Sequence, residues 1–556
     1  MRNGLSQRLQ PTQHLQPTQH LQPMQHLQPM RHLQPNFSRM LRRALRAHEE
    51  GEFDKAERLY TALLRQRSDD FDALHGLGRI YYRRGRLDAA LALIQAALKS
   101  DICRPDGFAS LGLVFHALGQ FQRALVSYDE GLRLEPNDAE LLNRRGVALL
   151  ELNRPREALE NFERVLAFDP NHFDGLGNLG NALLKLNRVM EALAAYDRAL
   201  KLAPENAQLL TNRAVALRRL DRPHEARISA GRALLSKPDF AQARFVESVA
   251  RLTLGDFSGW RGYEARWRVG ALASQRRSFA APLWLGKESL EGKTILLHAE
   301  QGFGDTIQFA RFAPLLAARG ARVILEVQPP LARLLSQMQG AAAVLARDAP
   351  SPRYDFHCPL LSLPLACATT PETVPAEIPY IAPAEADVAS WRACLPRRRP
   401  LVGLVWSGER LHDNDLNRSM LLATLAPLLD LPDIGFVSLQ HEVREADAAF
   451  LRSRSDVMQI GAKFTDFADT AAALCALDAV ISVDTAVAHL AGAMGVPVFL
   501  LLPFAADFRW LRERADSPWY PSLRLFRQPQ FGDWDSVVKL LRQELSQFGT
   551  RCGRAA

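Results

Sequence analysis

The sequence lacks the features of a membrane-spanning, secreted or metal-binding protein. Its 556 residues contain no apolar run of roughly 18 residues, the length that a membrane-spanning helix needs. The N-terminal region is polar and has no apolar core of a secretory signal. Six cysteines are scattered without CxxC spacing, which argues against a disulfide framework or a zinc site and for a reducing compartment. These absences predict a cytoplasmic protein without a transmembrane segment.

Length and composition are those of a multidomain globular protein. Hydrophobic residues make up 47% of the chain and charged residues 23%, both ordinary values. A chain of 556 residues is too long for one hydrophobic core, so we expect two to four domains.

Positive charge is concentrated in one stretch of the chain. Between Glu205 and Arg277 there are 14 Lys and Arg against 7 Asp and Glu. This excess favours an anionic partner: a phosphorylated donor, an acidic acceptor or peripheral contact with a membrane surface. The alternative is a solvated face of arginine-rich helices. The sequence has no interleaved aromatic and basic residues of the kind that bind nucleic acid, so we expect no nucleic-acid partner.

The N-terminus is a low-complexity tract. A six-residue motif, LQPTQH with small variations, recurs from Leu9 to His32. Its regular prolines break helices, and it has too few large apolar groups to offset the entropy of ordering. We expect residues 1–36 to be disordered. The tract is a simple-sequence expansion, or it is not translated because the true start is Met40. Translation from Met1 and translation from Met40 both fit the sequence.

The next 220 residues carry an internal repeat. Helix-breaking or turn-permissive residues recur every 34 residues, and each is preceded by leucines at helical spacing and a small residue such as Gly112 or Gly180. Proline at 136, 170, 204 and 238 ends four of the six full units, while Ser68 and Ile102 stand at this position in the first two. The recurring turn residues are Gly51, Gly85, Gly119, Asn153, Asn187, Asp221 and Gly255.

This period and pattern resemble the tetratricopeptide repeat. The resemblance implies an α-solenoid over residues 37–256, with six repeats and a partial seventh, and a groove that holds a protein or peptide partner. Asn178, Asn181 and Asn212 fall on first helices, where the repeats of O-GlcNAc transferases use asparagines to hold a peptide backbone. Because only one unit carries two such asparagines, ordinary polar groove residues are the expected role, and the ladder is the alternative. The segment 257–292, with its Trp260 and Tyr263, is expected to cap the array and join it to the next domain.

From Lys293 onward the pattern changes to alternating strands and helices. Apolar runs at 294–299, 321–327, 401–406, 435–440, 478–483 and 497–502 predict buried parallel strands. The segment LPRRRP at 395–400 is interpreted as a linker between two doubly wound domains, 293–395 and 400–546. The predicted fold class is therefore an α-solenoid followed by an α/β, GT-B-like pair of domains.

Two candidate sites lie where strands of such domains end. Gly302 and Gly304 allow a tight turn after the first strand, and Asp305 follows them; a simple helix cap is the alternative role for this aspartate. The second site begins at Asp484, directly after the strand at 478–483. The start of a helix there presents free N–H groups and a positive dipole to a phosphate.

These segments resemble the glycosyltransferase family 9, or heptosyltransferase-like, domain over residues 294–545. The resemblance rests on the GxGD turn and on DTAVAHLAGAMG, followed by the strand PVFLLLP. It implies that Asp305 is the catalytic base, and that Asp484, Thr485 and His489 contact the ribose or phosphate of the donor.

The same resemblance places further donor contacts in the second domain. The backbone amides around Ala486 and Val487 and the side chain of Arg418 would bind the diphosphate, with Ser407 beside them. Gln440, at the end of the next strand, is a further candidate for the donor site. The segments FAADFRW and SPWYPSLRLFRQ are typical of repeat-linked bacterial versions of this domain rather than of true heptosyltransferases. The resemblance therefore does not imply that the donor sugar is a heptose.

The expected activity is inverting, metal-independent sugar transfer from a nucleotide-diphosphate sugar, with that sugar as co-substrate and no other cofactor. Asp413-Asn414-Asp415 spells the metal-binding DxD motif of another glycosyltransferase fold, but here it lies in a polar loop and we expect no metal. The alternative is a protein-interaction scaffold whose GT-B-like half is catalytically inactive.

Overall fold

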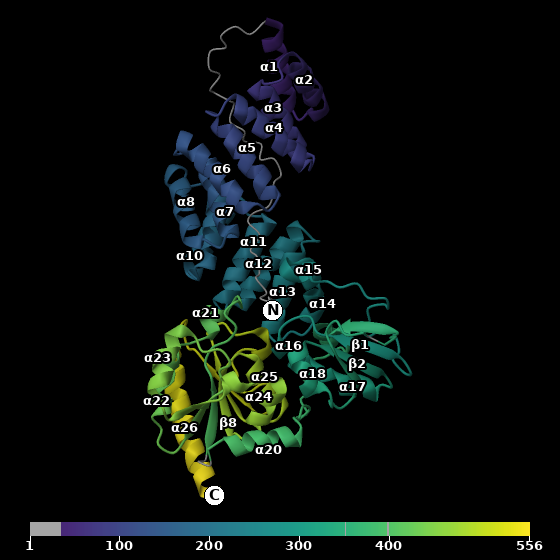
Figure 1. Cartoon of the computed structure of the whole chain (residues 1–556), viewed down its shortest axis with the longest axis vertical. Helices are drawn as coiled ribbons and strands as arrows, with labels where there is room; N and C mark the ends of the chain where they lie inside the picture. The colour runs from purple at the N-terminus through teal and green to yellow at the C-terminus, as the bar shows by residue number, and fades with distance from the viewer. Residues whose placement is uncertain (1–34, 351, 397–399, 556) are drawn as a thin grey trace. The chain divides into compact units, whose positions relative to one another are not determined.

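The computed structural model describes residues 35–350, 352–396 and 400–555 (Figure 1). The described chain forms two compact units, which divide between Ala216 and Leu217. The predicted disordered tract lies outside the described residues up to position 34, and so does the middle of the predicted linker, at 397–399. The predicted repeat array ends at residue 256, whereas the two compact units divide at 216/217. The domain boundaries drawn from the sequence remain predictions.

The repeat region consists of thirteen helices of nearly equal length. The second helices α2, α4, α6, α8 and α10 each pack on the first helix of their own unit, and successive first helices from α1 to α9 also contact one another. The helices are α1 (Pro35–Glu49), α2 (Phe53–Gln66), α3 (Phe71–Arg83), α4 (Leu87–Ser100), α5 (Pro105–Ala117), α6 (Phe121–Leu134), α7 (Ala139–Glu151), α8 (Pro155–Phe168), α9 (Phe173–Lys185), α10 (Val189–Leu202), α11 (Ala207–Arg219), α12 (Pro223–Ser236) and α13 (Ala241–Thr253).

The turns between paired helices confirm the 34-residue period. All seven predicted turn residues have a positive φ, between 52° and 79°. Glycine takes this left-handed conformation freely, and asparagine and aspartate tolerate it better than other residues. The turn positions therefore accept only these three residue types without strain.

The small residues of the first helices allow the second helices to approach closely. A Cβ atom on Gly112 would lie 2.3 Å from the ring of Tyr128, and one on Gly180 would lie 2.4 Å from the ring of Tyr196. Gly146 stands in the same relation to Phe162, at 2.5 Å. In each pair the ring fills the place of the missing side chain, so the glycines are required by packing.

An aromatic segment joins the last repeat helix to the sheets. It contains α14 (Gly259–Tyr263), the 3-10 helix η1 (Glu264–Arg268) and α15 (Gly270–Ser274). The ring of Trp260 meets those of Phe309 and Phe508 edge-on, at 5.9 and 5.6 Å between centroids. The rings of α14 thus pack into the same hydrophobic core as the α/β part.

The first sheet has four parallel strands in the order β3-β2-β1-β4. Helix α16 (Phe303–Ala310) follows β1 directly and packs with α17 (Phe312–Ala318) in the core beside it. The other helices of this part are α18 (Pro329–Leu335), α19 (Leu363–Ala366) and α20 (Glu385–Cys394), with the 3-10 helix η2 (Leu360–Ser362). The strands are β1 (Thr294–His298), β2 (Arg322–Val327), β3 (Ala341–Ala346) and β4 (Phe356–Pro359).

The second sheet has six parallel strands in the order β10-β9-β8-β5-β6-β7. Counted along the chain from β5, this is the doubly wound order 3-2-1-4-5-6. Its strands are β5 (Leu401–Val405), β6 (Gly435–Ser438), β7 (Val457–Gln459), β8 (Ala479–Val483), β9 (Val498–Leu502) and β10 (Leu523–Arg527). The fold class predicted from the sequence, a helical solenoid followed by an α/β region with parallel sheets, is confirmed.

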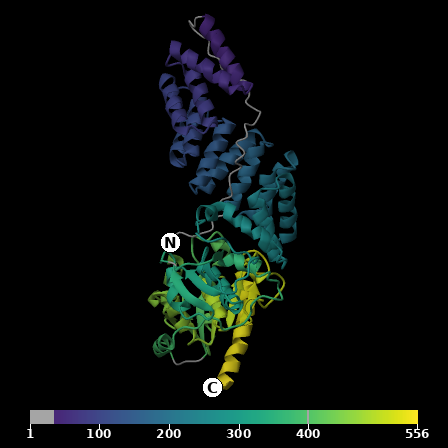
Figure 2. The same ribbon diagram turned by 90° about the vertical axis from the view of Figure 1, so that its right-hand side faces the viewer.

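Short helices connect these six strands. They are α21 (Asp415–Arg418), α22 (Ala426–Leu429), α23 (Glu445–Ser453), α24 (Phe467–Leu474) and α25 (Ala486–Ala493), with the 3-10 helices η3 (Leu422–Leu425), η4 (Gly461–Lys463) and η5 (Phe508–Trp510). The long helix α26 (Trp534–Ala555) projects from the sheet region, as both views show (Figures 1 and 2).

Candidate functional site: a charged cluster at the strand ends

The candidate site lies at the point where the strand order of the second sheet reverses. Strands β5 and β8 are neighbours, and the chain leaves them in opposite directions. Ligands of doubly wound folds bind in the crevice that forms there, outside the carboxyl ends of the strands. Ser407 follows β5 and Asp484 follows β8, so two residues predicted from the sequence lie at this point.

Arg418 reaches this crevice from α21. Its Nη1 donates a hydrogen bond to the carbonyl oxygen of Asp484 at 2.8 Å, and its buried Nε has no partner among the described residues. Burial lowers the pKa of the guanidinium, and the Asp484 charge acts against that shift. A Cβ atom on Gly408 would lie 2.6 Å from Arg418 Nη2, so a larger residue there would displace the guanidinium from this position.

Gln440 holds the backbone of Ser407. Its amide nitrogen donates to the carbonyl oxygen of Ser407 at 3.0 Å, and its amide oxygen accepts from the Ser407 N–H at 3.3 Å. Both polar ends of Gln440 are therefore occupied, which favours a positioning role over direct contact with a ligand. The hydroxyl of Ser407 is buried and has no partner in the described chain.

The start of α25 faces the same crevice. Thr485 is its N-cap residue, with no hydrogen bond from its side chain to the helix. The N–H groups of Ala486 and Val487 lie in the first turn, where a helix offers no internal acceptor. His489, one turn in, is buried.

His489 is packed on its far side. Its Nδ1 lies 3.0 Å from the hydroxyl of Tyr520, its Nε2 lies 3.8 Å from Asp484 Oδ1, and its ring stacks on Trp510. Burial lowers its pKa to about 3, so the imidazole is neutral at physiological pH. The predicted donor contact is thus limited to Nε2, and it remains a prediction.

Asp305 lies at the carboxyl end of the first sheet, in the first turn of α16. Its Oδ2 accepts the N–H of Gly302 at 2.8 Å, which is the capping role left open by the sequence, while its Oδ1 is ion-paired with Arg509. A Cβ atom on Gly304 would lie 2.7 Å from His489 Cδ2, so this glycine lets α16 approach α25. Asp305 and the Asp484–His489 segment are thereby brought together.

Arg509, the cation of this cluster, was not predicted from the sequence. It donates to Gln308 Oε1 at 2.8 Å and to Asp507 Oδ1 at 2.7 Å, and it also pairs with Asp305. Burial raises the pKa of Asp305, and the Arg509 charge opposes that rise. The signal was present in the sequence: FAADFRW places two charged residues among apolar ones directly after a buried strand.

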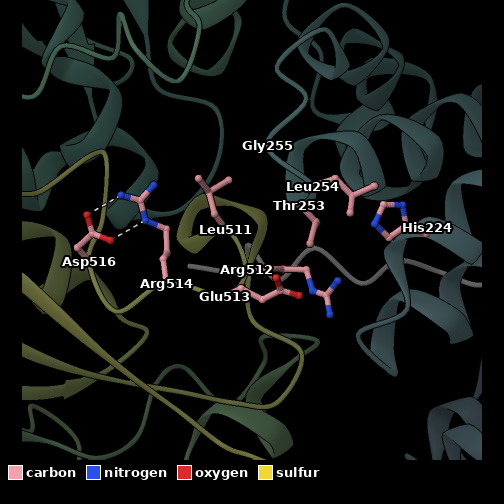
Figure 3. A pocket seen from close by; sticks show the side chains of 9 residues that line it. All are labelled: His224, Thr253, Leu254, Gly255, Leu511, Arg512, Glu513, Arg514 and Asp516. Carbon is pink, nitrogen blue, oxygen red and sulfur yellow. Dashed lines mark hydrogen bonds and ion pairs between the residues drawn. The ribbon is translucent and has the colours of Figure 1, made fainter.

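The loop that carries Arg509 has a strained backbone. Leu511 and Glu513 have φ angles of 51° and 54°, which cost energy in residues other than glycine. The same loop borders a cavity of about 510 Å³ lined by His224, Thr253, Leu254, Gly255, Leu511, Arg512, Glu513, Arg514 and Asp516 (Figure 3). Figure 3 shows Arg514 paired with Asp516 at one end of the cavity.

In the first sheet, the space at the carboxyl end of β1 is filled by the protein's own side chains. Glu300, after β1, is ion-paired with Arg266 at 2.9 Å and accepts the N–H of Leu361 at 3.0 Å. Arg266 also contacts Glu264 and the hydroxyl of Ser362. This buried network fixes the aromatic joining segment to the sheet.

Potential metal ligands do not cluster in the described part of the chain. Among the described residues no group of three or more His, Cys, Asp or Glu side chains is placed to hold an ion. Within the DxD sequence, Asp415 is ion-paired with Arg444 at 2.8 Å. The carboxylate of Asp415 thus has a structural partner.

The first helices of the repeat region are joined by buried polar side chains. Asn178 donates to Asn143 at 3.0 Å, and Asn212 donates to Asn181 at 3.0 Å. Asn178, Asn181 and Asn212 are at most 2% exposed, so they bind neighbouring units rather than standing open in a groove. This corrects the expectation that they are ordinary polar residues of an open groove, and it argues equally against the alternative of a ladder for a peptide backbone.

Within the part of the chain that the structure describes, no helix is both long and apolar enough to cross a membrane. Five cysteines in that part are free thiols: Cys103, Cys358, Cys367, Cys394 and Cys475.

Comparisons with known proteins identify the repeats. Models of the tetratricopeptide repeat match residues 41–106, 112–153, 139–172 and 173–206. Protein FlbA of Caulobacter vibrioides is 29% identical over 331 residues, which cover 55% of this chain and 55% of FlbA. The chain therefore spans about half the length of this curated relative.

Several solved structures are similar to the repeat region. A tetratricopeptide repeat protein from Parabacteroides merdae is 16% identical, covering 43% of this chain and 95% of its own, with a TM-score of 0.37. PilF of Pseudomonas aeruginosa is 17% identical, covering 37% of this chain and 95% of its own, with a TM-score of 0.34. On the matches to the repeat models and the 34-residue register of its turns, the N-terminal part of this chain is an array of tetratricopeptide repeats.

Proposed function

We propose that this chain is a protein-interaction protein whose repeat array holds an extended segment of a partner protein. Tetratricopeptide arrays are a type of fold that binds proteins and peptides along the surface formed by their first helices. The observation that carries the proposal is the set of buried bridges between successive first helices: His75 to Ser110 at 2.8 Å, Asn143 to Asn178, and Asn181 to Asn212.

These bridges matter because they make the surface rigid. A preorganised surface loses little entropy when a partner binds, so more of the contact energy appears as affinity. Side chains beside the bridges remain accessible, among them the half-exposed Leu113 on α5 and Val147 on α7. The proposed contact surface is the inner face, defined as the accessible side chains of α3, α5, α7 and α9.

Site-specific photo-crosslinking in cells tests this proposal. A photoreactive phenylalanine analogue at Leu113 or Val147 should give a discrete crosslinked partner protein. The same analogue at Val126 on α6 or at Met190 on α10, which are 54% and 65% exposed, serves as the control on second helices. Equal crosslinking from first and second helices, or none from first helices, would reject binding at the inner face.

A second function, sugar transfer, is favoured by the charged cluster in the α/β part. Arg418 Nε and Ser407 Oγ are buried without partners at the strand-order reversal, which is where an anionic ligand with several oxygens would satisfy them. We propose a nucleotide-diphosphate sugar as that ligand. Arg418 and the N–H groups at the start of α25 would stabilise the departing diphosphate in place of a metal.

Asp305 is the proposed general base of this reaction. It would take the proton of an acceptor hydroxyl, whose oxygen attacks the anomeric carbon from the face opposite the leaving diphosphate, with inversion. Burial raises its pKa, and the ion pair with Arg509 opposes that rise and favours the ionised carboxylate. The acceptor would be the protein that the repeat array holds, and the cytoplasm is the proposed compartment.

A nucleotide-binding assay distinguishes the proposed sugar transferase from a scaffold whose α/β half is inactive. UDP, ADP or GDP should raise the melting temperature of the wild-type chain, and Arg418→Gln should remove the rise because it loses the cation. Sugar transfer by Asp305→Asn at the wild-type rate would eliminate Asp305 as the base. If none of these nucleotides raises the melting temperature, sugar transfer is rejected and only the protein-interaction function remains.

A further inference from the structure

Arg418 reaches the candidate site from a long connection. Residues 406–421 separate strand β5 from the 3-10 helix η3, whereas strand-to-helix connections in α/β folds are usually about two to six residues long. We call residues 408–419 the crevice loop. Leu411 and Leu416 are 65% and 77% exposed, so packing in the hydrophobic core does not hold the tip of this loop.

The crevice loop contains α21, a single helical turn that begins at Asp415 and ends at Arg418. One turn is too short to be stable alone, because the cost of starting a helix is recovered only over about 12 residues or more. Contacts with the rest of the domain must therefore hold α21 in place. The position of the Arg418 side chain depends on those contacts.

Arg444, directly before α23, supplies such contacts. Its Nη2 donates hydrogen bonds to Oδ2 of Asp415 at 2.8 Å and to the carbonyl oxygen of Gly408 at 2.9 Å. Asp415 Oδ1 also accepts a hydrogen bond from the hydroxyl of Ser419, and that hydroxyl accepts the N–H of Gly408 at 3.0 Å. Arg444 thus ties the first residue of α21 to the start of the crevice loop, and Ser419 closes the loop at its end.

This anchor is shielded from water and lies beside Arg418. The side chains of Arg444 and Asp415 are 21% and 8% exposed, and charge-assisted hydrogen bonds are stronger in such surroundings than in open solvent. The Arg418 guanidinium lies against Gly408, and its Nη1 donates to the carbonyl oxygen of Asp484. Movement of the crevice loop would therefore take Arg418 away from the start of α25.

We propose that the Arg444–Asp415 ion pair positions Arg418 for the diphosphate of the donor, and that neither partner of the pair contacts the ligand. The inference rests on the proposed sugar-transfer function and adds two positioning residues to its donor site. Asp415 of the DxD sequence would then serve the diphosphate through an arginine instead of through a metal ion. The competing role is direct contact of Arg444 with the ligand, because its Nε is buried without a partner in the described chain.

Calorimetric titration of the full chain with UDP, ADP or GDP, whichever stabilises wild type most, tests the proposal. Asp415→Asn keeps the shape of the side chain but removes its charge, and it should weaken binding about tenfold. Arg418→Gln should weaken binding at least as much. Because Asp415 acts through Arg418, the double variant should bind within about twofold of Arg418→Gln alone.

Asp430→Asn is the matched control, because Asp430 is paired with Arg454 at 2.7 Å in the same domain, outside the crevice loop. It should bind the nucleotide within about twofold of wild type. Trypsin should cleave after the exposed Arg410 faster in Asp415→Asn than in Asp430→Asn, with no nucleotide present. Arg444→Lys, which keeps the cation, should retain more affinity than Arg444→Gln, and this comparison does not depend on the folding of Asp415→Asn.

Wild-type affinity in Asp415→Asn, or equal cleavage of the two asparagine variants, would overturn the proposal. A further loss of affinity on adding Arg444→Gln to Arg418→Gln would also overturn it, because Arg444 would then contact the ligand itself. If wild type binds none of the nucleotides, sugar transfer fails and the positioning role fails with it. Binding by wild type that Asp415→Asn fully retains leaves sugar transfer standing and rejects the positioning role alone.

Discussion

Arg512 holds the carboxylate of Asp221 through two nitrogens, Nε at 3.1 Å and Nη2 at 3.0 Å. Asp221 is the left-handed turn residue between α11 and α12, with a φ of 52°. Arg512 lies three residues after Arg509, in the strained loop beside the charged cluster. The loop that supplies Arg509 to the candidate site is therefore anchored, through Arg512, to the repeat turn at Asp221.

Loss of this anchor should loosen the loop. Arg512→Gln is expected to destabilise this unit by roughly 1 kcal/mol, since two nitrogens of Arg512 share Oδ2 of Asp221 and the pair is only partly exposed. The loop should also become more sensitive to limited proteolysis. Arg514→Gln, which removes a pair with Asp516 in the same loop, is the control. Identical cleavage of the two variants would show that the Asp221 contact does not anchor the loop.

The Arg266–Glu300 pair should be far more important for stability than an exposed pair. Both side chains are buried, so Arg266→Met leaves an unpaired charge and should cost roughly 3 to 5 kcal/mol. Adding Glu300→Gln should recover part of this loss because the buried charge is then gone. Arg333→Met breaks pairs with Asp387, Asp466 and Asp469, but Arg333 is 43% exposed, so this change should cost less than Arg266→Met, roughly 1 to 2 kcal/mol.

Chemical denaturation followed by tryptophan fluorescence measures these effects in the α/β part. All the tryptophans follow residue 256, so the signal reports that part of the chain. Similar losses in Arg266→Met and Arg333→Met would contradict the importance given to the buried network.

The repeat array should lose stability in mild acid because of His75. Burial lowers the pKa of His75 to about 4, below its ordinary value of 6.5. A lowered pKa stabilises the folded state above pH 6.5, and this contribution is lost as the pH falls towards 4. The loss should amount to roughly 1 to 3 kcal/mol.

Circular dichroism in urea, at pH 7 and pH 5, measures this loss through the helices of the array. His75→Asn installs the residue that stands at the equivalent position 143, and it should reduce the pH dependence. An unchanged pH dependence in this variant would show that other groups, such as His48 with its pKa of about 4, control the acid sensitivity.

Two glycines on repeat helices should respond in opposite ways to alanine. Gly180→Ala forces a methyl group towards the Tyr196 ring, at 2.4 Å, and should cost roughly 1 to 3 kcal/mol. Gly231 in α12 has open space around it, so Gly231→Ala should stabilise its helix by up to about 1 kcal/mol. Thermal unfolding followed by circular dichroism compares the two. A stabilising Gly180→Ala would refute the packing argument.

The sequence predicted the central strands and missed the edges. Strands β1, β2, β5, β6, β8 and β9 all correspond to continuous apolar runs, which buried parallel strands require. The four strands that were missed, β3, β4, β7 and β10, are the edge strands of their sheets. Edge strands are less buried: β3 is apolar throughout but only partly buried, and β10 contains two arginines.

The candidate site was predicted only in part, for a related reason. Asp305 and Asp484 follow apolar strands, and that position in the chain is visible in the sequence. Arg509 reaches Asp305 across about two hundred residues of chain, and no local pattern encodes such a pairing. Gln440 was correctly placed at a strand end, but its bonds to the Ser407 backbone depend on the neighbouring strand.

The most direct test of the account is the affinity of the array for its crosslinked partner. A peptide from the crosslinked segment is titrated calorimetrically into wild-type chain, Leu113→Glu and Val126→Glu. Leu113→Glu places a charge on the inner face and should weaken binding at least about tenfold, while Val126→Glu on a second helix should stay within about twofold. Equal affinities for the three chains would contradict the claim that the partner lies on the inner face.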